Sequence, residues 1–151
     1  MCGIIGLFLK DQSLQAQLGT LLTEMLVTMS DRGPDSAGIA IYGGDGEVSS
    51  STTKFTLQSN APHQDFAELA ADMAAATSID DSKVSLDVKD THAVLTVPAG
   101  ITADVRASLG EIRPTVRIMS VGGAIEIYKE VGLPRSVAER FSVSQMRGTH
   151  G

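Results

Sequence analysis

The residues best suited to chemistry stand at the very start of the chain. Cys2, the only cysteine among the 151 residues, follows Met1 and precedes Gly3. Because the side chain at position 2 is small, we expect Met1 to be removed, which leaves a thiol and a free α-amine on one residue. An N-terminal amine can serve as the base that activates a thiol, and the two groups ordinarily titrate at about 7.7–8.0 and about 8.5. A lone cysteine is more often a small buried hydrophobe, so these residues alone leave both the nucleophile and the buried hydrophobe open.

A second stretch, Asp-Arg-Gly-Pro-Asp-Ser-Ala-Gly at residues 31–38, lies about 30 residues further on. Together with Met-Cys-Gly-Ile-Ile-Gly at residues 1–6, it resembles the class II glutamine amidotransferases, N-terminal-nucleophile hydrolases that release ammonia from glutamine. The branch it resembles most holds the glutamate synthase and N-methylglutamate synthase amidotransferase subunits. The family often has His before the Arg, whereas this chain has Asp31. The resemblance covers residues 1 to about 42.

The resemblance implies a fold, an activity and a set of site residues. The implied fold is α+β, with the αββα layers of the N-terminal-nucleophile hydrolases. The implied reaction is hydrolysis of the glutamine side-chain amide by Cys2, with ammonia passed to a synthase subunit or domain such as a glutamate synthase-like enzyme. Arg32, Gly33 and Asp35 are the implied glutamine-binding residues, and no cofactor is implied.

Other parts of the family's site are expected outside this sequence. In the family, the arginine for the glutamine carboxylate, the Asn-Gly oxyanion donors and the aspartate for the amine follow later in the chain. Arg147-Gly-Thr-His150 does not have the order of the arginine-bearing motif, Gly-His-Thr-Arg. We therefore expect residues 1–151 to be the amino-terminal part of an amidotransferase domain, with weak glutamine binding by itself. The alternative is a catalytically incomplete binding or regulatory module of the same fold.

The loop residues have structural alternatives. Arg32 either lies near Cys2, where its positive charge would lower the pKa of the thiol, or pairs with Asp31 or Asp35 on the surface. Gly33 and Pro34 are expected to shape the turn. For Asp35 and Ser36, capping or bracing of the loop through backbone bonds is favoured over contact with substrate.

Composition narrows the classes of function. A formal net charge of −6 disfavours non-specific nucleic-acid binding, and no run of apolar residues is long enough to span a membrane. With one cysteine and neither a basic leader nor a cleavage site, we expect a cytoplasmic protein. His63 and His92 have no second ligand at metal spacing, so both are expected on the surface and no metal is predicted.

The elements expected to position the motif residues follow from periodicity. Residues 3–9 are predicted to form a buried strand. A helix capped by Asp11 or Ser13 follows, weakened slightly by Gly19 and ended before Pro34. A hairpin is predicted from strands at 37–42 and 48–57, joined by the Gly-rich turn at 43–46. The apolar stripe expected on the helix comprises Leu14, Leu18, Leu21, Leu22, Met25, Leu26 and Met29.

Residues 62–141 are predicted to form an inserted α+β subdomain in the order αββαββα. Helical spacing after Pro62 is followed by two alternating segments, at 84–88 and 93–97. A helix after Thr102, two strands around Gly122-Gly123 and a short helix opened by Pro134 complete the order. The subdomain is expected to pack apart from the part that carries Cys2.

Overall fold

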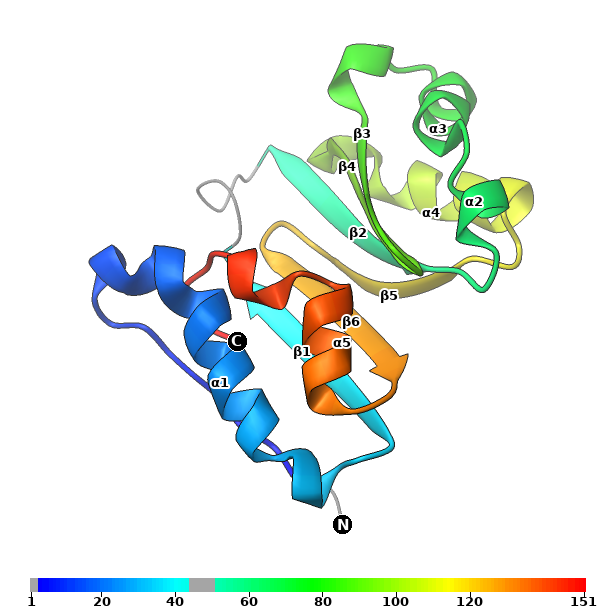
Figure 1. Cartoon of the computed structure of the whole chain (residues 1–151). Coiled ribbons are helices and arrows are strands. Elements are labelled where there is room, and N and C mark those ends of the chain that lie inside the picture. The colour runs from blue at the N-terminus through cyan, green and yellow to red at the C-terminus, as the bar shows by residue number, and fades with distance from the viewer. Residues whose placement is uncertain (1–2, 44–50) are drawn as a thin grey trace. The chain divides into compact units, whose positions relative to one another are not determined.

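The computed structural model describes residues 3–43 and 51–151 (Figure 1). Their contacts divide them into two compact units, one formed by residues 3–43 with 127–151 and the other by residues 51–126. Both units combine helices with antiparallel strands, which confirms the α+β class. In the described residues no helix combines the length and apolar character needed to cross a bilayer.

The sheet of the first unit is built from distant parts of the chain. Strand β1 (Ser36–Tyr42) pairs with β6 (Ile125–Val131). On the other side of β1, the Tyr42 amide donates to the His150 carbonyl at 2.9 Å, and the Thr149 amide donates to the Tyr42 carbonyl at 2.8 Å. Residues 149–151 in turn bond to residues 7–9, with Leu7 N to Gly151 O at 2.8 Å. The C-terminal segment therefore lies between the N-terminal segment and β1.

Two predictions for this unit are wrong. The predicted strand at 3–9 is reduced to an isolated bridge at Phe8, which pairs with His150. The predicted hairpin does not form either, because β2 (Thr52–Gln58) pairs with strands of the other unit and not with β1. The Gly-rich turn expected at 43–46 lies largely outside the described residues. For β2, the partners β4 and β5 replace the sequence neighbour that the local pattern suggests.

Helix α1 (Leu18–Thr28) packs in the first unit with α5 (Pro134–Arg140), and Figure 1 shows both beside β1 and β6. The Asp11 side chain accepts from the Ser13 amide at 2.9 Å and caps the 3-10 turn η1 (Gln12–Gln17), which leads into α1. Of the predicted apolar stripe, Leu18 and Leu22 are buried, and the other members are half-buried. The turns η2 (Ser30–Arg32) and η5 (Val143–Gln145) complete this unit.

Gly19 has a role that helix propensity does not reveal. A Cβ on Gly19 would lie 2.0 Å from the Val143 carbonyl oxygen and 2.7 Å from that of Met146. The Gly19 amide also donates to the Met146 carbonyl at 3.0 Å. The glycine is therefore what allows the backbone of η5 to approach α1.

The second unit follows the order β2-α2-α3-β3-β4-α4-β5. Its remaining elements are α2 (Pro62–Asp65), α3 (Leu69–Thr77), η3 (Asp81–Lys83), β3 (Ser85–Lys89), β4 (His92–Pro98), η4 (Ala99–Ile101), α4 (Thr102–Ile112) and β5 (Arg117–Gly122). The strands form one antiparallel sheet in the spatial order β3-β4-β2-β5. With α2 and α3 taken together as the first helical connection, this is the βαββαβ order of ferredoxin-like folds.

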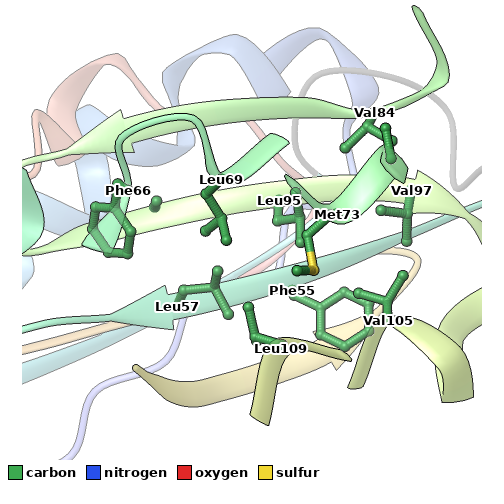
Figure 2. Close-up of a cluster of buried hydrophobic side chains, with 12 residues drawn as sticks. Phe55, Leu57, Phe66, Leu69, Met73, Val84, Leu95, Val97, Val105 and Leu109 are labelled. Atoms are coloured by element: carbon green, nitrogen blue, oxygen red, sulfur yellow. The ribbon is translucent and has the colours of Figure 1, made fainter. Parts of the chain in front are cut away.

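Alternate residues of the central strands carry the core of this unit. Phe55 lies opposite Leu95 of β4 and Val121 of β5. Figure 2 shows this side of the sheet meeting Leu69 and Met73 of α3 and Val105 and Leu109 of α4. Both helices cover the same face, as the period-2 pattern of the strands requires.

The observed unit differs from the predicted boundaries of 62–141 at both ends. Strand β2, which precedes residue 62, is central to its sheet. Helix α5 contacts α1 and β1 and belongs to the first unit, as does most of β6. An inserted subdomain with the boundaries 62–141 is therefore not what the contacts delimit.

Candidate active site

Cys2 lies outside the described residues, but Gly3 is placed. A Cβ added to Gly3 would lie 2.3 Å from Met29 Cε, 3.4 Å from Arg32 Cβ and 3.7 Å from Arg32 Cδ. Gly3, the residue next to Cys2, thus packs against Met29, which directly follows α1, and against Arg32, the first residue of the Arg-Gly-Pro-Asp loop. Two motifs about 30 residues apart in sequence meet at this contact.

Arg32 is the last residue of η2, and its amide donates to the Met29 carbonyl at 2.9 Å. The Arg32 side chain is exposed, and within the described part of the chain it forms no ion pair with Asp31 or Asp35. The surface pairing considered as an alternative is absent. A guanidinium without a carboxylate partner remains available to an anion.

Gly33 closes the turn, with its amide donating to the Ser30 carbonyl at 3.3 Å. Its φ is −154°, and among residues 3–43 and 51–151 a Cβ would meet nothing nearer than the Ser36 carbonyl oxygen at 4.0 Å, so the backbone does not demand glycine. No described residue fills the side of the loop toward which a side chain at position 33 would project.

Asp35 braces the loop through its main chain. Its exposed carboxylate makes no hydrogen bond to another residue that the structure describes. Its main-chain carbonyl accepts from the Gly132 amide at 2.9 Å. Asp35 therefore bonds to Gly132 through its main chain and not through its side chain.

The turn between β6 and α5, residues Val131 to Leu133, was not among the predicted site residues. Gly132 has φ +136°, a conformation that disfavours any side chain, and it is flanked by Val131 and Leu133, which are 78% and 52% exposed. Glycine followed two residues later by Pro134 is an ordinary turn signal. Nothing in the sequence links this turn to Asp35, about 100 residues earlier.

The two histidines considered as metal ligands, His63 and His92, differ in exposure. His63 is exposed, as predicted, but His92 is fully buried in β4, so the prediction of a surface residue is wrong there. Its Nδ1 lies 3.1 Å from Thr91 Oγ1. Over residues 3–43 and 51–151, no three side chains of His, Cys, Asp or Glu gather as a metal site would require.

Comparison with known proteins points to amidotransferases. The chain is 55% identical over 151 residues to "Glutamine amidotransferase-like protein GlxB" of Rhizobium meliloti (strain 1021), covering all of this chain and 48% of that protein. It is 27% identical over 160 residues to a protein of Methanothermobacter thermautotrophicus named "Putative glutamine amidotransferase", covering 99% of this chain and 50% of the relative. No protein-family model and no solved structure matches the chain. The chain thus spans about half the length of these two proteins, one named glutamine amidotransferase-like and the other putative glutamine amidotransferase.

Proposed function

We propose that this chain is the amino-terminal part of a class II glutamine amidotransferase domain, of the N-terminal-nucleophile type. The observation that carries the proposal is the contact of Gly3 with Met29 and Arg32, which brings the residue beside Cys2 to the Arg-Gly-Pro-Asp loop. The similarity to one protein named glutamine amidotransferase-like and to another named putative glutamine amidotransferase supports the amidotransferase part of the proposal, and not its class.

In the proposed reaction the Cys2 thiolate attacks the side-chain amide carbon of glutamine. The α-amine of Cys2 takes the thiol proton and returns it to the departing nitrogen, so that ammonia leaves. Water then hydrolyses the γ-glutamyl thioester, which releases glutamate and regenerates the thiol. The ammonia passes to a synthase subunit or domain in the cytoplasm, of the glutamate synthase-like class that the motif resembles.

The loop residues contribute charge and space. Arg32 supplies a positive charge close to Gly3, which favours the thiolate of Cys2 or binds an anionic group of glutamine. Gly33 leaves its side of the loop open for substrate. The exposed carboxylate of Asp35 is suited to the substrate ammonium, since it accepts no hydrogen bond from the described protein.

Ammonia release from glutamine by the full-length natural protein tests the proposal, with variants at Cys2. Cys2→Ala should abolish release, and Cys2→Ser should keep at most a trace, because a hydroxyl is far less ionised near neutral pH. Intact-mass measurement should show loss of Met1. Unchanged release by Cys2→Ala, or Met1 retained in active protein, would refute the mechanism.

Arg32 gives a second, graded test. Arg32→Ala should lower kcat/KM for glutamine by about tenfold or more, the equivalent of one charge-assisted hydrogen bond of about 1.5–3 kcal/mol. Arg32→Lys should restore part of the loss, because it keeps the charge without the planar fork. Glutamine binding without any hydrolysis in the unsubstituted protein would favour the binding-module alternative instead.

A further inference from the structure

We infer that Gly132, in the turn between β6 and α5, is a positioning residue that holds the Arg32–Asp35 loop beside the N-terminus. The inference rests on the proposed function, because it takes Cys2 as the nucleophile on which the loop acts. It adds to the site a residue that lies about 100 positions away from the motif.

The first step is the hydrogen bond that joins the two segments. β1 begins at Ser36 and β6 ends at Val131, so Asp35 and Gly132 are the residues just beyond the two paired strand ends. The Gly132 amide donates to the Asp35 carbonyl at 2.9 Å and so extends the β1–β6 pairing by one step into the loop. This bond ties down the end of the loop that leads into β1.

The second step is the backbone of the turn. At φ +136°, Gly132 occupies a region that is essentially closed to residues with a Cβ. Space is not the reason for glycine, because a Cβ would be 3.7 Å from Val137 Cγ2, an ordinary contact. Glycine is therefore needed for the backbone conformation, and this conformation orients the Gly132 amide toward the Asp35 carbonyl.

The third step concerns the contacts that connect the turn to α5. The Val131 amide donates to Glu130 Oε1 at 2.9 Å, and Glu130 Oε2 lies 3.5 Å from Arg140 Nη1 of α5. Pro134, the first residue of α5, is buried. These contacts fix the turn to α5, so the bond to Asp35 has a firm donor.

The fourth step is the opposite end of the loop. The Arg32 amide bonds to Met29, the Gly33 amide bonds to Ser30, and Gly3 packs on Met29 and Arg32. The loop is thus held at one end by the residues that follow α1 and at the other by Gly132. Releasing the Gly132 end should let Arg32 move relative to Gly3 and hence, if the proposed function holds, change the reactivity of the Cys2 thiol.

The experiment measures thiol reactivity in the whole 151-residue chain, where Cys2 is the only cysteine. Alkylation by iodoacetamide is followed against pH for the unsubstituted chain and for Gly132→Ala. If Arg32 favours the thiolate, its displacement should raise the thiol pKa and slow alkylation at pH 7 by about 3- to 10-fold, as expected for a rise of 0.5 to 1 in the pKa. Gly110→Ala is the matched control, because a Cβ there meets nothing within 4 Å, and its alkylation should be unchanged.

Combining the substitutions separates positioning from a general structural effect. If Gly132 acts through Arg32, Gly132→Ala should have no further effect on alkylation in an Arg32→Ala background. Independent, multiplied effects of the two substitutions would overturn the inference, and so would an unchanged pH profile for folded Gly132→Ala. These readouts need no glutamine, so a failure here is distinct from a failure of the proposed glutaminase activity.

If Gly132→Ala does not fold, amide hydrogen exchange in the unsubstituted chain tests whether the Gly132 amide is held by its hydrogen bond to Asp35. The Gly132 amide should exchange at least tenfold more slowly than an unstructured amide, with protection similar to that of the Gly33 amide at the other end of the loop. Exchange of Gly132 at the unstructured rate, with β6 still protected, would overturn the inference.

Discussion

Replacing Gly19 by alanine should destabilise the first unit, although helix propensity alone predicts the reverse. Alanine is favoured over glycine in a helix interior by about 0.5–1 kcal/mol. Here the new methyl carbon would lie 2.0 Å from the Val143 carbonyl oxygen and 2.9 Å from the Met146 amide nitrogen. These are backbone atoms of η5 and of Met146, the residue that follows η5, and they cannot move aside as the end of a flexible side chain can.

The size of the effect follows from three contributions. Overpacking of this kind costs about 1–3 kcal/mol. Separating the segments also weakens the hydrogen bond from the Gly19 amide to the Met146 carbonyl, worth about 0.5–1.5 kcal/mol. These exceed the gain in helix propensity, so the free energy of unfolding should fall by about 0.5–4 kcal/mol, with a central value of about 2 kcal/mol.

The assay is urea unfolding followed by tyrosine fluorescence. The sequence has two tyrosines and no tryptophan, and Tyr42 and Tyr128 both belong to the first unit. With a denaturant slope of about 2 kcal/mol/M, a loss of about 2 kcal/mol should lower the midpoint by about 1 M at unchanged slope. Gly110→Ala, in the second unit, should leave this transition in place and stabilise α4 by about 0.4–1 kcal/mol. A midpoint for Gly19→Ala equal to or above that of the unsubstituted chain would refute the reasoning.

Two further predictions concern the second unit. Arg113 Nη2 donates to Asp72 Oδ2 at 2.6 Å and to a backbone carbonyl, so Arg113→Ala should lower the free energy of unfolding of this unit by about 2–3 kcal/mol. Arg106→Ala, an exposed control on the same helix region, should change it by less than about 0.5 kcal/mol, and equal effects would contradict the role of Arg113. The Asp80 carboxylate accepts from the Ser82 hydroxyl at 2.7 Å and from the Ser82 amide at 2.9 Å, which lowers its pKa below the ordinary value. A lowered pKa in the folded state adds stability above the unfolded pKa and loses it as pH falls through the folded pKa. Ser82→Ala should therefore move the Asp80 carboxyl midpoint upward in an NMR titration, and an unmoved midpoint would show that the hydroxyl is not its cause.

The sequence by itself determined which residues can carry the chemistry. A single cysteine at position 2 and the Arg-Gly-Pro-Asp loop are visible without any coordinates, and so is the end of α1 before Pro34. Local signals also placed β3, β4 and α4 close to their observed bounds, because alternation and helical spacing follow from the residues within each element.

The tertiary structure alone decided which elements pair. β1 and β2 are neighbours in sequence, yet β1 pairs with β6 and β2 with β4 and β5. Strand pattern specifies a face to bury and leaves the partner open, and the partner is chosen by packing over the whole fold. For the same reason the prediction at residues 62–141 missed β2 and included α5.

The surroundings of single residues at close contacts could not be predicted from the sequence either, because they also depend on distant segments. Local sequence predicts that Gly19 weakens a helix and that His92 lies on the surface, because neither residue has a local pattern that indicates its surroundings. The bond between Asp35 and Gly132 joins residues about 100 positions apart. The sequence supplied the reactive groups, whereas the approach of Gly3 to Arg32 and the support of the loop by Gly132 exist only where the folded backbone brings distant segments together.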